Sequence, residues 1–274
     1  MGRFAELLEA GERPLWLDAT DYAGRLLANG AIPWFDLAAF IAWHGKAHAL
    51  LRPDVTALPL APLTAAWLAA HPALADAMKA KRRTVWPLKT LLADDAFRRH
   101  AEELLRALRT SHEQLPLALV LPSPRHWLAG AYVAAHGAAP ETGEDEIDSA
   151  AMYLADFLRT FGNAGLDAIL LEEDVRSEPR SLAEVGWYQP VLNVAAHFRW
   201  DAGLHLPVAA DYPGGEAGFD FIVAPRVIAG QASGVVPGTG FWQGEAVPAA
   251  DFLLVRIPGD AEPETVLERL ALLR

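Results

Sequence analysis

Three consecutive carboxylates, Glu172, Glu173 and Asp174, follow directly on a buried apolar run and are the residues best suited to chemistry. Crowded carboxyl groups repel one another, which raises at least one pKa toward the range of a general acid or base. Adjacent residues at a strand end face opposite ways, so at most two of the three point into one site. For Glu172 or Glu173 we favour proton transfer over pairing with Arg176 or Arg180. For Asp174 we favour the pairing.

A second polar group, His197, Arg199, Asp201 and His205, is the densest mixture of basic and acidic side chains in the sequence. Histidine titrates near neutral pH and arginine binds carboxylates in a fork, so together they can hold and protonate an anionic substrate. We assign His197 to catalysis, with a structural role as the alternative, and Arg199 and Asp201 to substrate binding. A metal site with His-Asp-His spacing is less favoured. His205 lies inside an apolar strand pattern, which favours a structural role.

Ser123, Arg125 and His126 open a predicted helix directly after an apolar strand. Free backbone N–H groups at a helix start, with an arginine beside them, form a site for a carboxylate or phosphate. We therefore expect these three residues to contact the substrate. An ordinary capped turn with a surface arginine is the equally favoured alternative.

Two glycine-rich loops, at 211–215 and 238–242, follow predicted strands. Neither matches a phosphate-binding or dinucleotide-binding fingerprint, so the glycines are expected to serve tight turns and close approach to a ligand. Asp211, Tyr212 and Trp242 are the side chains that we expect to contact the substrate there. Packing is the alternative role for the tryptophan.

Metal chemistry has little support in the sequence. His44 and His48 stand four apart on a predicted helix, a spacing that can bind a metal, but the glutamate that marks a zinc hydrolase is missing between them. A packing or surface role is therefore favoured for both. The chain has no cysteine, which excludes disulfides, thiolate metal sites and cysteine nucleophiles. We expect neither a metal nor a cofactor.

The amino-acid composition limits the classes of binding partner that we expect. The 274 residues include 23 Lys and Arg against 35 Asp and Glu, for a net charge of −12. No basic cluster is long enough to follow a nucleic-acid backbone, so nucleic acid and anionic membranes are not expected partners. The N-terminus lacks the pattern of a secretory signal, and polar residues interrupt every long apolar run. We expect a soluble, cytoplasmic protein that binds a small molecule, with a homodimer left open.

Apolar runs alternate with helical patterns along the chain, which predicts parallel strands joined by right-handed crossovers. Eight or nine strands in a chain of this length favour an α/β fold of the (β/α)8 TIM-barrel type over an open sheet. One domain over residues 1–274 is expected, with 1–13 as an N-terminal helical extension and short or absent outer helices in the C-terminal half. Helices are predicted at 63–81, 94–112, 124–136 and 144–163. The predicted strands are 14–18, 55–60, 117–121, 167–172, 190–196, 204–209, 219–224, 233–236 and 252–257.

Residues 165–178, which contain the carboxylate run, resemble the segment of cobalamin-independent methionine synthases where a strand ends in Asp-Glu-Pro and continues to Arg-Glu. The segment 119–124 resembles that family's strand ending in Gly-Pro before a helix, and 233–238 resembles its closing strands. The likeness spans roughly residues 115–274. It implies a barrel of the methionine synthase and uroporphyrinogen decarboxylase superfamily. The first two carboxylates of the run match the acidic pair that anchors an amino-acid ligand there.

The zinc ligands of the methionine synthases do not recur at the matching strand ends. That family holds zinc with two Cys, a His and a Glu, whereas the ends here are Asn-Val-Ala-Ala-His at 193–197, Ile-Val-Ala-Pro at 222–225 and Ile-Pro-Gly-Asp at 257–260. Both Cys and the Glu are missing. Thiol-activating zinc, and homocysteine methylation through it, are therefore not expected.

The resemblance then implies a metal-free lyase or group-transfer enzyme that acts on a small carboxylated substrate, aromatic acids included. In this hypothesis Arg125 or Arg199 holds the carboxylate, and His197 moves protons together with Glu172 or Glu173. Two alternatives stay open. One is a barrel that binds small molecules without catalysis, and the other is a methyltransferase-like enzyme with a rebuilt metal site.

Overall fold

Eight parallel strands form the centre of the protein in this computed structural model, which describes residues 2–10, 13–176, 178–179, 181–209 and 218–274. The strands are hydrogen-bonded in the order β1-β8-β7-β6-β5-β4-β3-β2. Their bounds are β1 Leu15–Asp18, β2 Thr56–Pro59, β3 Leu117–Pro122, β4 Ala168–Glu172, β5 Asp201–His205, β6 Phe221–Ala224, β7 Ala232–Val235 and β8 Phe252–Arg256.

The sheet curls into a nearly closed (β/α)8 TIM barrel, as the sequence predicts. Among the described residues, β1 and β2 meet through one isolated bridge, between Trp16 and Val55. Asp54 reinforces this contact, because its backbone N–H donates to the Leu15 carbonyl at 2.9 Å and its Oδ2 accepts from Leu15 N at 2.7 Å. Toward their carboxyl ends the two strands are not paired, which leaves a seam in the barrel wall.

Aromatic rings close the amino-terminal end of the barrel interior. Phe4, from the first helix, lies 4.7 Å from the Phe221 ring, 5.4 Å from Phe252 and 5.6 Å from Trp16, centroid to centroid. Gly203 in β5 lies so close to the Phe221 ring that an added Cβ would collide with it. Since side chains of the described residues fill this end, the space for a ligand in the barrel interior lies toward the carboxyl ends of the strands.

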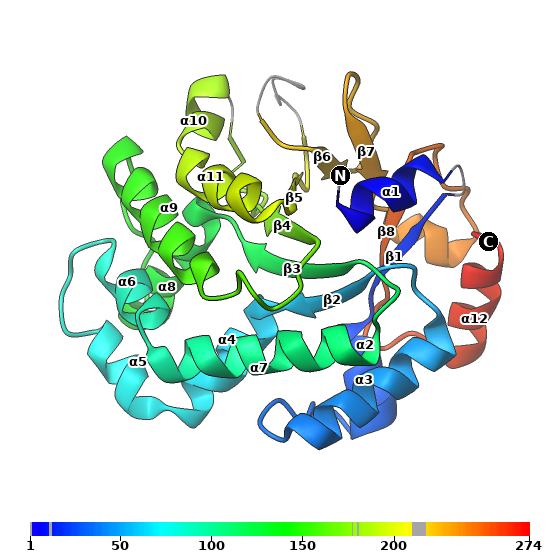
Figure 1. Cartoon of the computed structure of the whole chain (residues 1–274), viewed down its shortest axis with the longest axis horizontal. Coiled ribbons are helices and arrows are strands. Elements are labelled where there is room, and N and C mark those ends of the chain that lie inside the picture. The colour runs from blue at the N-terminus through cyan, green and yellow to red at the C-terminus, as the bar shows by residue number, and fades with distance from the viewer. Residues whose placement is uncertain (1, 11–12, 177, 180, 210–217) are drawn as a thin grey trace.

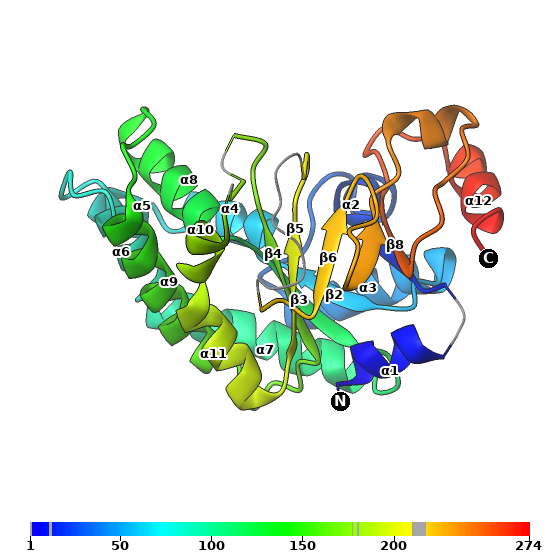
Figure 2. The same cartoon turned by 90° about the horizontal axis from the view of Figure 1, so that it is seen from above.

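Helices cover the outside of the sheet, with α5, α6, α8 and α9 on one side and α12 on the other (Figures 1 and 2). Between β5 and β8 the described residues hold only a short 3-10 helix, η2 (Thr239–Gln243), which confirms the expected thinning of the C-terminal half. No helix in the described part is both long and apolar enough to cross a membrane. The helices are α1 Arg3–Glu9, α2 Thr20–Ala28, α3 Leu37–Leu51, α4 Leu60–Ala70, α5 Pro72–Met78, α6 Trp86–Leu92, α7 Asp95–Ser111, α8 Pro124–His136, α9 Glu144–Arg159, α10 Leu182–Gly186, α11 Gln189–Phe198 and α12 Pro263–Ala271.

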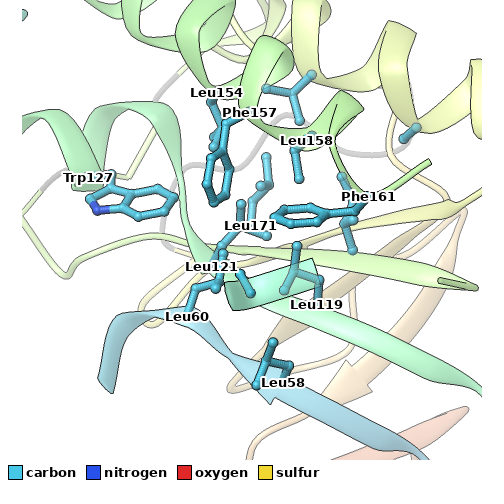
Figure 3. Close-up of a cluster of buried hydrophobic side chains, with 14 of the residues drawn as sticks. Leu58, Leu60, Leu119, Leu121, Trp127, Leu154, Phe157, Leu158, Phe161 and Leu171 are labelled. Carbon is cyan, nitrogen blue, oxygen red and sulfur yellow. The ribbon is translucent and has the colours of Figure 1, made fainter. Parts of the chain in front are cut away.

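The largest apolar core lies between the outer face of the sheet and these helices. Figure 3 shows leucines of β2, β3 and β4, Leu171 among them, beneath aromatic rings of α9 and its C-terminal extension. Phe157 packs edge-on against Trp127 of α8 and against Phe161, with ring centroids 5.9 Å and 5.0 Å apart. This packing fixes α8 and α9 against β3 and β4, and therefore fixes the strand ends that carry the site.

Three sequence predictions need correction. Residues 190–196 are not a strand but most of α11, because Val191, Leu192, Val194 and Ala195 are buried on one helical face while Asn193 is exposed. The strand expected at 204–209 begins and ends earlier, at 201–205. The helix expected at 63–81 breaks at position 71 into α4 and α5, where a proline begins the second helix.

Candidate active site

A cavity of about 380 Å³, which we call the mouth cavity, lies toward the carboxyl ends of the strands and is lined by residues of β1, β2, β3, β4 and β8. Side chains alternate between the two faces of a strand. Asp18, Glu172 and Arg256 each lie two residues after an apolar side chain of the barrel interior, so all three point inward at the strand ends. The polar residues that line the mouth cavity are Asp18, Thr20, Asp21, Glu172 and Arg256.

Arg256 connects opposite sides of this cavity. Its Nη2 donates to Oε1 of Glu172 and lies 3.3 Å from Nδ1 of His205, and its Nε is 3.9 Å from Oδ2 of Asp18. Strands β8 and β4 are four positions apart in the order of the eight-stranded sheet. The guanidinium therefore spans the mouth. Thr20 completes the group, because its Oγ1 donates to Oδ1 of Asp18 at 3.0 Å.

The surroundings of Glu172 in the mouth shift the pKa of its carboxyl group. Burial raises the pKa of the Glu172 carboxyl, the Arg256 charge opposes this, and the Asp18 carboxylate adds to the rise. The net effect is a pKa above the usual value for glutamate. A raised pKa brings a carboxyl group closer to the range in which a general acid or base works.

His205 is a neutral partner in the same group. Burial, together with the nearby Arg256 charge, lowers the pKa of His205 to about 3. An arginine can only donate hydrogen bonds, so Nδ1 of His205, which faces the guanidinium, acts as the acceptor. The ring proton is then on Nε2. Sequence reasoning placed His205 in a structural role, whereas the structure places it directly against Arg256 and Glu172.

Glu173 faces away from the mouth and holds elements together. Ser123 Oγ donates to its Oε2 at 2.8 Å, and the hydroxyl of Tyr188 donates to its Oε1. All three residues are buried. Ser123 also caps α8 by accepting from His126 N at 3.0 Å, and its own N–H donates to the carbonyl of Glu172 at 2.9 Å. This network ties β3, β4 and the start of α11 together and positions the Glu172 backbone.

Arg125 and His126 are also engaged within the protein. Arg125 Nη2 donates to Oε2 of Glu184 at 2.8 Å, and its guanidinium lies 5.3 Å from the centre of the Trp187 ring. His126 Nδ1 is 2.9 Å from the carbonyl oxygen of Glu172. The anion site expected at this helix start is therefore occupied by a side-chain cap and internal contacts, and only His126 of the two contacts the Glu172 backbone among the described residues.

His197, Arg199 and Asp201 lie at the opposite end of the barrel from Glu172. The chain returns through α11 from the carboxyl to the amino ends of the strands, and these residues stand where α11 ends and β5 begins. His197 and Arg199 are exposed, and Asp201 accepts from Ala5 N at 3.1 Å. The expected partnership between His197 and Glu172 is therefore absent from the structure, because the segment before His197 is a helix and not a strand.

The remaining predicted contacts lie elsewhere. Trp242 packs against Phe241 in η2, with ring centroids 5.0 Å apart, and does not line the mouth cavity. Asp211 and Tyr212 lie outside the described residues. Asp174 accepts from the backbone N–H of Arg176 at 2.9 Å. In the part of the chain that the structure describes, no group of three or more acidic or histidine side chains is arranged to hold a metal ion.

Sequence reasoning missed Asp18, Thr20 and Arg256. The signal was present, because Asp18 and Arg256 both end correctly predicted strands and both follow the inward alternation. A polar residue at the carboxyl end of each predicted strand, the first and the last included, is the signal that points to Asp18 and Arg256. What the sequence does not contain is the pairing of Arg256 with Glu172 across 84 residues.

Comparisons with known proteins add little beyond the fold. No protein-family model and no curated protein matches the sequence. The carboxyl transferase domain of Rhizobium etli pyruvate carboxylase, in a structure with 3-bromopyruvate, aligns over 100% of this chain and 49% of its own, with 11% identity and a TM-score of 0.48. This chain thus spans about half the length of that domain structure. A candidate lyase/mutase from Burkholderia cenocepacia J2315 aligns over 99% of this chain and 84% of its own, with 14% identity and a TM-score of 0.42.

A type I 3-dehydroquinate dehydratase from Clostridium difficile aligns over 64% of this chain and 75% of its own, with 13% identity and a TM-score of 0.32. At such identities and scores no activity can be transferred from these proteins. The class of protein follows from the chain's own strands: it is a TIM-barrel protein with a charged mouth cavity.

Proposed function

We propose that this protein is a lyase or group-transfer enzyme that uses general acid–base catalysis on a small carboxylated substrate in the mouth cavity. The observation that carries the proposal is the contact between Arg256 and the partly buried, inward-facing Glu172 at the carboxyl ends of β8 and β4. Active sites of TIM barrels lie at this end of the strands. In this proposal Glu172 moves the proton and Arg256 binds the substrate.

Arg256 is suited to hold a carboxylate. Among the described residues, the hydrogen bonds of its guanidinium all involve Nη2, so Nη1 and Nε have donors to offer a ligand. The side chain is partly exposed to the mouth. Arginine binds carboxylates through two parallel N–H groups, which fixes the orientation of the ligand as well as its position. Thr20 and Asp18 provide further polar contacts beside it.

Substrate binding would change the protonation of Glu172. A substrate carboxylate at Arg256 adds a negative charge and competes with Glu172 for the guanidinium. Both effects raise the pKa of Glu172 further, so the side chain takes up a proton as the substrate binds. It then donates that proton to the reacting atom and becomes the carboxylate that can accept one back. The hypothesis that His197 shares this work is dropped, because His197 lies at the other end of the barrel.

The proposed chemistry relies on Glu172 and Arg256, with His205, Asp18 and Thr20 beside them. A zinc ion of the thiol-activating kind is not part of it, since the chain has no cysteine with which to build that site. The membership of the methionine synthase and uroporphyrinogen decarboxylase superfamily stays a proposal that rests on the sequence resemblance. Its acidic pair corresponds to one residue in the mouth, Glu172, and one structural residue, Glu173.

The test is a ligand screen followed by turnover. Thermal unfolding is measured with 2-oxo, 2-hydroxy, aromatic and dicarboxylic acids, and acids that raise the Tm by a few degrees are assayed for conversion. Wild type and the control Glu268→Gln, an exposed residue of α12, are expected to bind and convert the same acid. Glu172→Gln is expected to bind without converting it, and Arg256→Gln to lose binding. Binding that survives Arg256→Gln would refute the proposal, and binding without turnover in wild type would favour the non-catalytic barrel.

A further inference from the structure

A second, smaller cavity of about 70 Å³ lies behind the barrel wall, between β1, β2 and α3; we call it the side pocket. Its walls are largely apolar and include the rings of Trp34, Phe40 and Trp43. Trp34 stacks on Phe40 with ring centroids 5.4 Å apart, and the indole N–H of Trp43 donates to the Ala23 carbonyl at 3.1 Å. These contacts hold the aromatic walls in place, so the cavity is built into the fold.

The side pocket adjoins the mouth cavity at the seam between β1 and β2. Four residues, Leu17, Thr20, Ala57 and Pro59, line both cavities. The seam exists because the two strands share only the Trp16 bridge within the described residues and are unpaired toward their carboxyl ends. A molecule held in the mouth beside Thr20 can therefore extend one end toward the side pocket without crossing a hydrogen-bonded sheet.

Two buried polar atoms in residues that line the side pocket have no hydrogen-bond partner among the described residues. They are Oγ1 of Thr56, a residue that is 1% exposed, and Nε2 of His48. Buried polar atoms in proteins are paired in the great majority of cases, so unpaired ones on the wall of a cavity indicate a missing partner. Thr56 can donate or accept, and the histidine ring nitrogen can do either according to its tautomer.

The histidines in and beside the side pocket are neutral, which disfavours an ion as its ligand. His44 Nδ1 lies 3.2 Å from His112 Nε2, and the rings of His48 and His112 are 4.4 Å apart. Burial lowers the pKa of His44 to about 3 and that of His112 to about 4, and it also lowers the pKa of His48. The three rings are therefore neutral at physiological pH. A neutral group with an apolar body and one hydrogen-bonding atom fits these walls better than a charged one.

We propose that the side pocket binds the neutral end of the substrate, a short hydroxyalkyl group whose hydroxyl pairs with Thr56 and His48, while its carboxylate lies at Arg256. This inference rests on the proposed function for the carboxylate end only. A cavity of this size has room for about two to four heavy atoms. The substrate class is then a short hydroxy acid with its hydroxyl remote from the carboxylate.

The pocket itself is tested with a neutral probe that does not need Arg256. Propan-1-ol is titrated into the protein while the imidazole resonances of His44, His48 and His112 are followed by NMR. We expect saturable shifts in wild type and in Arg256→Gln. Ala47→Leu, which fills the pocket, should weaken the binding of propan-1-ol by about tenfold. Ala42→Leu, on the exposed face of the same helix, should leave this affinity unchanged. Thr56→Val, which replaces the hydroxyl with a methyl group of similar size, should weaken propan-1-ol binding without disturbing the fold.

The link to the substrate is tested with two acids by calorimetry. 4-Hydroxybutanoate should bind at least several-fold more tightly than butanoate in wild type, and this advantage should disappear in Thr56→Val and Ala47→Leu. Failure of the proposed function is distinguishable, because both acids would then fail to bind while propan-1-ol still shifts the histidine resonances. The inference is overturned if propan-1-ol leaves those resonances unchanged in wild type, or if Thr56→Val and Ala47→Leu bind both probes as wild type does.

Discussion

The guanidinium of Arg256 on β8 donates to the carboxylate of Glu172 on β4, across the mouth of the barrel. The two strands lie on opposite sides of the barrel, so the contact joins residues that neither strand pairing nor proximity in the sequence brings together. It leaves a partly buried carboxyl group with a raised pKa beside a more exposed cation. In the proposed function these two side chains are the proton carrier and the anion site of one cavity.

Glu172→Gln is expected to slow turnover of the substrate strongly while keeping the fold. The amide can still accept a hydrogen bond from Arg256 but can neither donate a carboxylic proton nor take one up. Loss of a general acid or base typically reduces kcat by about 10²–10⁴-fold. Steady-state kinetics of the variant, with circular dichroism as the control for folding, checks this. A kcat within a few-fold of wild type would remove Glu172 from the mechanism.

Arg256→Gln is expected to raise the pKa of Glu172 further. The variant removes the positive charge that opposes the effect of burial and leaves the Asp18 carboxylate, which adds to the rise. A titration of the glutamate side-chain carboxyl by ¹³C NMR, assigned with Glu172→Gln, measures the change. Arg256→Lys keeps the charge and should give an intermediate result. An unchanged or lower pKa in Arg256→Gln would show that the two side chains do not interact in solution.

Acid is expected to destabilise the protein through its buried histidines. The pKa of His205 is about 3 in the folded chain, against about 6.5 when unfolded, so as the pH falls the unfolded chain takes up the proton first. The part of the free energy of unfolding that depends on a neutral His205 is fully present above about pH 6.5, and it is lost progressively as the pH falls to about 3. Between pH 7 and pH 5 the loss from His205 is about 2 kcal/mol, with a smaller contribution from His44, whose ring is partly exposed.

Urea unfolding of wild type and His205→Gln at pH 7 and pH 5 tests this origin. The variant should lose less free energy of unfolding than wild type over the same interval, because it has no proton to take up at this position. Equal losses in both proteins would assign the acid sensitivity to other groups.

The sequence was sufficient for most of the architecture. Seven of the eight strands fall where apolar runs predict them, because a strand buried on both faces has a composition that is hard to mistake. The prediction of a strand at 190–196 was wrong because a short apolar run fits either a strand or a buried helix. Packing against the rest of the protein decides between the two. In the helix α11, one face carries the buried side chains of Val191, Leu192, Val194 and Ala195.

The site was predictable only in part. Its position after β4 follows from the carboxylate run, but the sequence could not choose between Glu172 and Glu173, since that choice depends on which face of the strand is inward. The structure places Glu172 in the mouth and Glu173 beneath Ser123 and Tyr188. The Arg256 partner could not be predicted, because it depends on closure of the barrel.

Gly203→Ala is expected to destabilise the barrel by about 1–3 kcal/mol, because the new methyl group would collide with the buried Phe221 ring. Gly130→Ala is the matched control. It lies in α8, where an added Cβ contacts nothing within 4 Å, and should stabilise the protein by about 0.5–1 kcal/mol through helix propensity. Thermal or urea unfolding compares the two. A neutral Gly203→Ala would mean that the interior is packed less tightly than described.

Proton uptake on ligand binding tests the central claim most directly. Binding of a small carboxylate is measured by calorimetry at pH 7 in buffers of different ionisation enthalpy, in wild type and in Glu172→Gln. The account predicts that wild type takes up a fraction of a proton, at most one, as the ligand reaches Arg256, and that Glu172→Gln binds the same ligand with none. Equal proton uptake in both proteins, or binding to wild type with no uptake at all, would contradict it.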